Sequence, residues 1–134
     1  MTISLHDCFL PCPDAGLEEI SRLFKQGSYS EELSSQLEGL DLEGNEVTGS
    51  SFASSGFTSA YDCPLIFLNI SCNPISIGGQ NLISDIISKN KVLRQLSLNS
   101  CGLEMKSLIN ITSNLLENST LQLLYIVISY SLHA

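Results

Sequence analysis

The sequence predicts an α/β fold, a solenoid of stacked strand–helix units, on the basis of three observations. A pattern of apolar residues returns at a spacing of 28 residues over much of the chain. Within a copy, apolar residues first alternate at a period of two, as in a strand, and then recur four residues apart, as on one helix face. The chain has 134 residues, 43% of them hydrophobic, which suits one domain with a buried core.

The clearest strand patterns lie in the second half of the chain. Residues 65–75 read LIFLNISCNPI, which fits LxxLxLxxNxI, and residues 93–103 read LRQLSLNSCGL, which fits LxxLxLxxCxL. Asn73 and Cys101 hold the same place 28 positions apart, and Asn45 lies another 28 positions upstream. We therefore predict three strands, near residues 40–45, 68–73 and 96–101.

Two weaker copies flank these three. Ile3 and Leu5, with Cys8 37 positions before Asn45, form a partial copy, so the first interval is nine residues longer. The last copy keeps Leu121, Leu124 and Ile126, but it has serine at residues 129 and 131, where Asn or Cys and an apolar residue are expected. We predict further strands near residues 3–8 and 124–129, which makes about four to five repeats in one domain over residues 1–134.

The polar residue after each strand has a structural explanation. An Asn or Cys there can turn inward and bond to backbone groups that are left unpaired as the chain leaves the strand. We predict this buried, structural role for four residues, which we call the ladder residues: Cys8, Asn45, Asn73 and Cys101.

The helical halves differ in quality. Residues 77–90 and 104–118 are amphipathic, and Gly79 leaves room near the first helix start, while Asn90 and Asn118 suit helix ends. The half after Asn45 is rich in Ser and Gly, which are poor helix formers. We predict a short or irregular helix there, packed by two aromatic residues, Phe52 and Phe57.

In the first unit, Asp14 is suited to cap a helix that Gly27 ends, and the extra nine residues would form a loop around residues 26–32. Taken together, residues 3–126 resemble the ribonuclease-inhibitor-like class of leucine-rich repeats, most specifically over residues 65–126. The resemblance implies a right-handed βα superhelix with parallel strands on the concave face and helices outside.

Within that class, residues 68–75, followed 28 positions later by residues 101–103, are similar to the C-terminal repeats of Tonsoku-like DNA-repair scaffold proteins. That closer resemblance implies a nuclear scaffold that assists recombination at damaged replication forks. The additional histone-binding modules of those proteins do not occur in this sequence.

Alternate strand positions of such a solenoid face outward on the concave sheet, and their side chains are the candidate binding surface. They are Ser4, His6, Asp41, Glu43, Asn69, Ser71, Ser97, Asn99, Tyr125 and Val127. Small polar residues with acid near Asp41 and Glu43 suit hydrogen bonds to a peptide and contact with a basic group. We therefore predict a basic protein partner. The alternatives are a solvated face without a partner, and a structural segment of a larger scaffold.

Charge argues against other partners. Six Lys+Arg and 14 Asp+Glu give a net charge of −8, which opposes binding to nucleic acid and to anionic lipid. The apolar stretch at residues 123–128 is too short to span a bilayer. No secretory signal pattern follows Met1, and five cysteines without a CxxC pair predict reduced thiols. We expect an intracellular location, cytoplasmic or nuclear.

No catalytic residue, metal site or cofactor is predicted. The two histidines, His6 and His133, lie near opposite ends of the chain, so neither is paired with a nucleophile. Cys8 and Cys12 lie near His6, but no second cluster completes tetrahedral metal ligation. The glycines form neither GxGxxG nor a phosphate-binding GK[ST] loop.

The two ends of the sequence lack convincing caps. Solenoids need caps because a terminal repeat exposes a strand edge and an apolar helix face. The chain opens in a strand-like segment at residues 2–5, and residues 123–132 are β-prone and uncharged. One interpretation, which we favour, is a fragment of a longer repeat protein; the other is a last strand covered by a partner or a second copy. We expect marginal stability or self-association.

Overall fold

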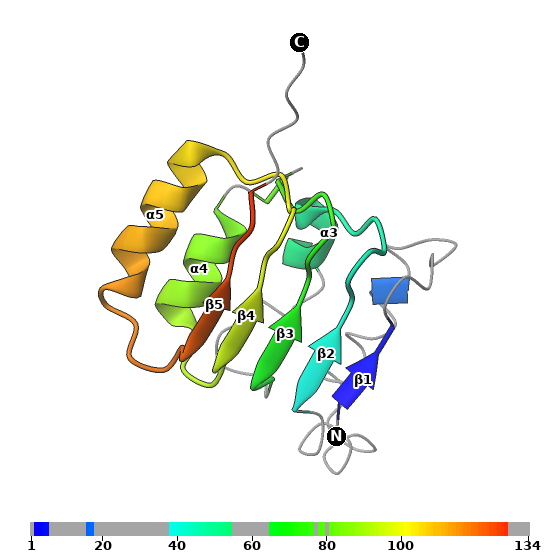
Figure 1. The fold of residues 1–134 in the computed structure, drawn as a ribbon, viewed down its shortest axis with the longest axis horizontal. Helices are drawn as coiled ribbons and strands as arrows, with labels where there is room; N and C mark the ends of the chain where they lie inside the picture. Colours follow the sequence, from blue (N-terminus) through cyan, green and yellow to red (C-terminus); the bar gives the residue numbers. More distant parts are fainter. Residues whose placement is uncertain are drawn as a thin grey trace.

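The computed structural model describes residues 2–5, 16–17, 38–54, 65–76, 78–79 and 81–128. They contain one five-stranded, all-parallel sheet with helices packed against it, so the predicted α/β class is confirmed (Figure 1). The strands are β1 (Thr2–Ser4), β2 (Gly39–Asp41), β3 (Phe67–Asn69), β4 (Gln95–Ser97) and β5 (Leu123–Tyr125). The helices are α3 (Gly49–Ser54), α4 (Leu82–Lys89) and α5 (Met105–Leu115).

The strands pair in chain order, β1 to β5. Leu40 pairs with Leu68, Leu68 with Leu96, and Leu96 with Leu124, always 28 residues apart, while Ile3 pairs with Leu40 across the longer first interval. The 28-residue spacing of the sequence is therefore also the spacing between paired residues in the sheet.

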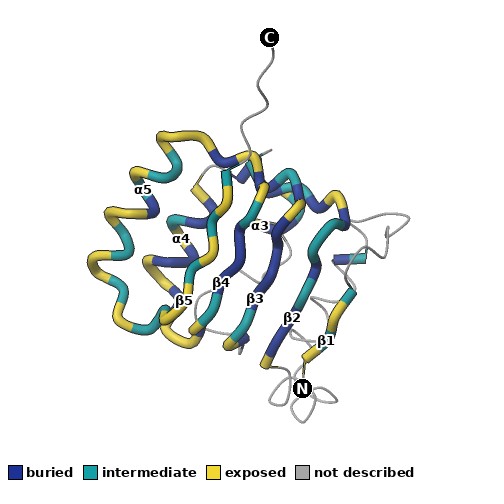
Figure 2. Tube along the Cα trace, in the orientation of Figure 1, coloured by how far each residue is buried: buried dark blue, intermediate teal, exposed yellow. Residues whose placement is uncertain are grey.

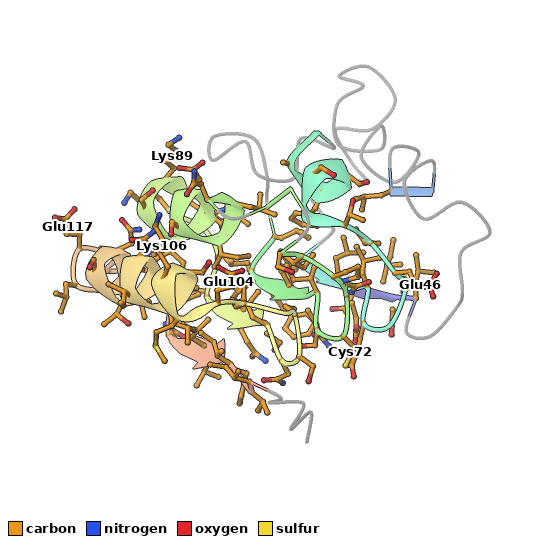
Figure 3. All side chains as sticks on the ribbon, turned by 90° about the horizontal axis from the view of Figure 1, so that it is seen from above. Glu46, Cys72, Lys89, Glu104, Lys106 and Glu117 are labelled. Atoms are coloured by element: carbon orange, nitrogen blue, oxygen red, sulfur yellow. The ribbon has the colours of Figure 1, made fainter. Side chains whose placement is uncertain are left out.

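The core lies between the sheet and its helices. The three helices lie on the same side of the strands (Figure 3), and buried positions line the surfaces between the two layers (Figure 2). The strand leucines Leu40, Leu68 and Leu96 are buried, and α4 buries four residues on one face: Leu82, Ile83, Ile86 and Ile87. In α5 only Ile111 is buried. No helix in the described part covers the other side of the sheet, which we call the open face.

Several element boundaries differ from the sequence prediction. The regular strands are three residues long, although interstrand hydrogen bonds continue beyond them, for example from the amide of Gly44 to the carbonyl oxygen of Ser71 at 3.1 Å. The predicted helix start near residue 77 is wrong, because α4 begins at Leu82. Gly78 has a φ of +71°, a left-handed conformation that a right-handed helix cannot contain.

The weaker helical half forms the six-residue helix α3, and its Phe52 is fully buried. Phe57, Asp14, Gly27 and the loop around residues 26–32 lie outside the described residues. Among the helices that the structure describes, none has the length and hydropathy needed to cross a membrane.

Candidate functional site

The side chain of Asn73 forms hydrogen bonds with five backbone groups at the turn after β3. Its Nδ2 donates to three carbonyl oxygens, those of Leu42, Ile70 and Ser71, at 2.9, 3.1 and 3.1 Å. Its Oδ1 accepts from two amides, those of Asn45 and Val47, at 3.0 and 2.9 Å. Because Asn73 is only 1% exposed, water cannot replace these partners. The side chain therefore ties its own turn to the preceding one.

Asn45 and Cys101 hold the equivalent places in the neighbouring turns. Asn45 Nδ2 donates to three carbonyl oxygens, those of Leu5, Leu42 and Glu43, at 2.7, 3.0 and 3.3 Å. Cys101 Sγ lies 3.3 Å from the carbonyl oxygen of Ile70 and 3.7 Å from that of Asn99. Cys8, the first predicted ladder residue, lies outside the described residues. These buried side chains hold the strand ends that carry the open face.

The thiol of Cys101 is far from reactive at neutral pH. Burial raises the pKa of Cys101 from 9.0 to about 11, and the nearby Cys72 also raises it, while backbone hydrogen bonds from Asn73 and Cys72 oppose the change. Cys101 is 2% exposed, whereas Cys72 is exposed. Cys101 is thus a buried thiol that stays protonated at neutral pH.

Stability should fall at alkaline pH because of Cys101. The unfolded thiol ionises near pH 9 and the folded thiol near pH 11. The protonated thiol of Cys101 therefore makes its full contribution to the free energy of unfolding below about pH 9. This contribution is lost as the pH rises through the pKa of the folded protein. We expect a loss of about 2–3 kcal/mol in the free energy of unfolding relative to Cys101→Ala. Urea titrations of both proteins from pH 8 to pH 11 measure this difference, and parallel pH profiles would contradict it.

An acidic cluster formed by Asp41, Glu43 and Asn69 lies on the open face. Leu40 and Leu42 are fully buried, so the alternating Asp41 and Glu43 point away from the core. Asn69 Nδ2 donates to Asp41 Oδ1 at 3.2 Å and to Glu43 Oε2 at 2.9 Å. The amide of Glu43 also donates to Asp41 Oδ1 at 3.0 Å. One amide side chain thus orients two carboxylates from the neighbouring turn.

The rest of the predicted surface is less exposed than expected. Asn69, Ser71 and Ser97 are 9%, 2% and 8% exposed, because side chains 28 residues apart pack side by side across the short strands. Ser71 Oγ accepts the amide of Asn99 at 3.0 Å, and Asn99 is half-buried. Some of the polar side chains that were predicted to bind a partner therefore already form hydrogen bonds within the sheet.

The exposed part of the predicted surface lies at its two ends. Tyr125 at the end of β5 and Val127 just after it are 46% and 59% exposed, and Ser4 is exposed at β1. Asp41 and Glu43 are half-buried in between, and His6 lies outside the described residues. The structure brings Asp41, Glu43 and Asn69 into contact and leaves Tyr125 three strands away from Asp41.

One row of open-face residues was missed by the sequence reasoning. Gly39, Phe67, Gln95 and Leu123 pair across β2 to β5, two positions before the row that contains Asp41. The period of two would have identified them, had it been extended to the first residue of each strand. The row adds apolar surface at Leu123, which is 49% exposed.

The open face offers hydrogen-bonding, acidic and apolar groups. No group of three or more His, Cys, Asp or Glu that could hold a metal ion occurs within the described ranges. A cleft of about 450 Å³ lies at the end of the sheet, lined mainly by apolar residues that include Leu98, Met105, Leu108 and Ile126. No family model and no curated protein matches the chain. The residues described above therefore carry the functional argument.

Proposed function

We propose that this chain is a leucine-rich-repeat solenoid of the ribonuclease-inhibitor-like class, and that its open face binds a protein segment with basic residues. Three features support the solenoid: the strands pair in chain order, paired residues are 28 positions apart, and Asn45 and Asn73 link successive turns. Stacked units of this kind bury a continuous core and leave one strand surface for binding.

The acidic cluster is the observation on which the binding proposal depends. Asn69 holds the carboxylates of Asp41 and Glu43 within hydrogen-bonding distance of one amide nitrogen. A carboxylate that is already ordered loses less conformational entropy when a partner binds. Lysine or arginine side chains of an extended segment would meet two acceptors at this point, and neighbouring polar and aromatic groups could contact the rest of the segment.

Charge reversal of the cluster tests the proposal. The probe is a panel of fluorescent peptides with spaced lysines and arginines, and binding is followed by anisotropy at several salt concentrations. We expect Asp41→Lys with Glu43→Lys to weaken the best-bound peptide by at least tenfold, because the cationic side chains then face like charges.

The matched control is Glu104→Lys with Glu117→Lys, which makes the same change in net charge at the two ends of α5 (Figure 3). This control should retain binding. An equal loss in both double variants would mean that only net charge attracts the peptides. Unchanged binding in the Asp41 and Glu43 variant would favour the second candidate, a structural segment of a larger scaffold such as a nuclear, Tonsoku-like protein.

A further inference from the structure

Within the described residues, the outer edge of β5 carries backbone groups that have no backbone partner. On its inner side, the carbonyl oxygens of Tyr125 and Val127 accept the amides of Leu98 and Ser100, both at 2.8 Å. The residues equivalent to those donors, 28 positions on, are Ile126 and Ile128. Their amides have no backbone acceptor in the part of the chain that the structure describes. An edge of this kind is a template for another strand.

The side chains along this edge do nothing to block such pairing. Natural sheet edges are usually protected by charged residues or proline. Neither occurs between Glu117 and His133. Instead, three large apolar side chains are exposed on the open face: Leu123 at 49%, Tyr125 at 46% and Val127 at 59%. As far as the described residues show, the edge therefore combines backbone groups without partners and exposed apolar side chains.

The absence of charged residues along β5 fits a second copy of the chain as the occupant. The chain has a net charge of −8, so two copies repel each other over most of their surfaces. The uncharged segment at β5 is a place where identical chains can meet without opposing like charges. A basic partner, by contrast, would gain nothing from this segment and is better matched by the acidic cluster.

We propose that two copies of this chain associate through β5, antiparallel about a two-fold axis that passes by Tyr125. The alternation of β5 points the backbone groups of Leu124 and Ile126 outward. With Tyr125 on the axis, Leu124 pairs with Ile126 of the second copy. In this pair, the backbone amide of each residue donates to the carbonyl oxygen of the other. On the open face, Leu123 then lies opposite Val127 of the second copy. Every cross-strand pair at the centre is apolar.

Helix α5 supports the same arrangement. It is the outermost helix at the β5 end of the sheet (Figure 1). Met105 and Ile109 on this helix and Leu116 at its C-cap are exposed apolar residues, and their spacing of four and seven residues places them on one helix face. A two-fold axis perpendicular to the sheet keeps the helices of both copies on the same side. The two α5 helices would then flank the new strand pair.

A charge-swap experiment tests the contact. One double variant carries Leu123→Lys and Val127→Lys, and the other carries Leu123→Glu and Val127→Glu. Both positions are about half exposed, so the fold should tolerate the changes. In the proposed register, residue 123 lies opposite residue 127 of the other copy. Each variant alone should weaken self-association at least tenfold, and an equimolar mixture should restore a heterodimer.

Sedimentation velocity over a range of concentrations measures the result. Wild-type protein should sediment with twice the mass of one chain. The control is Ile66→Lys with Val92→Lys, which places charges at two exposed apolar positions away from β5, and it should sediment like the wild type. Formation of the heterodimer also shows that the variants are folded. The proposal is overturned if wild-type protein sediments as a single chain, if the mixture stays unassociated, or if the control dissociates like the β5 variants.

Discussion

Replacing Asn73 by alanine should lower the free energy of unfolding by about 3–5 kcal/mol, because buried polar groups that lose their partner cost about 1–3 kcal/mol each. The amide side chain bonds three carbonyl oxygens and two backbone amides in a region closed to water. The loss is smaller than five separate penalties, because some of these groups have a second partner. Equilibrium denaturation in urea measures the change.

Asn114→Ala is the matched control for this prediction. Asn114 Nδ2 makes one hydrogen bond, to the carbonyl oxygen of Asn110 at 2.9 Å, within α5. That carbonyl oxygen keeps water or helix partners after the change, and alanine is the better helix former. We expect a difference below about 1 kcal/mol. If both alanine variants lost the same stability, Asn73 would have no special role in joining the turns.

Replacing Gly49 by alanine should destabilise the fold by at least about 3 kcal/mol, because atoms of the main chain would have to move. A Cβ at Gly49 would overlap the carbonyl oxygen of Ile75 and would lie 2.5 Å from the Cα of Gly79. Gly79 is restricted in the same way, since its Cβ would overlap the same oxygen. The two glycines allow neighbouring turns to approach at the start of α3.

Thermal and chemical denaturation of Gly49→Ala test this contact. The adjacent Ser50 is exposed, so Ser50→Ala serves as a control at nearly the same place in the chain and should change stability by less than about 0.5 kcal/mol. A Gly49→Ala protein as stable as the control would mean that the two turns can separate at little cost.

Much of the sheet was predictable because its periodicity is local. The period of two in residues 65–70 and 93–98 identifies strands, and the 28-residue spacing identifies which leucines pair. The positions of the ladder residues follow from the same spacing. A helix boundary was less predictable, since the pattern after residue 77 is amphipathic although Gly78 and Gly79 form a turn.

The α/β class, the strand order implied by a regular spacing, and the leucines of the core could all be predicted from the sequence. Which polar residues of the open face are available to a partner depends on how the strands pack. Ser71 and Ser97 are buried, while Asn69 forms hydrogen bonds with both Asp41 and Glu43. The exposure of a strand side chain depends on the side chains of the neighbouring turns. These neighbours lie 28 residues away in the sequence, so the local pattern does not indicate how much of a side chain they cover.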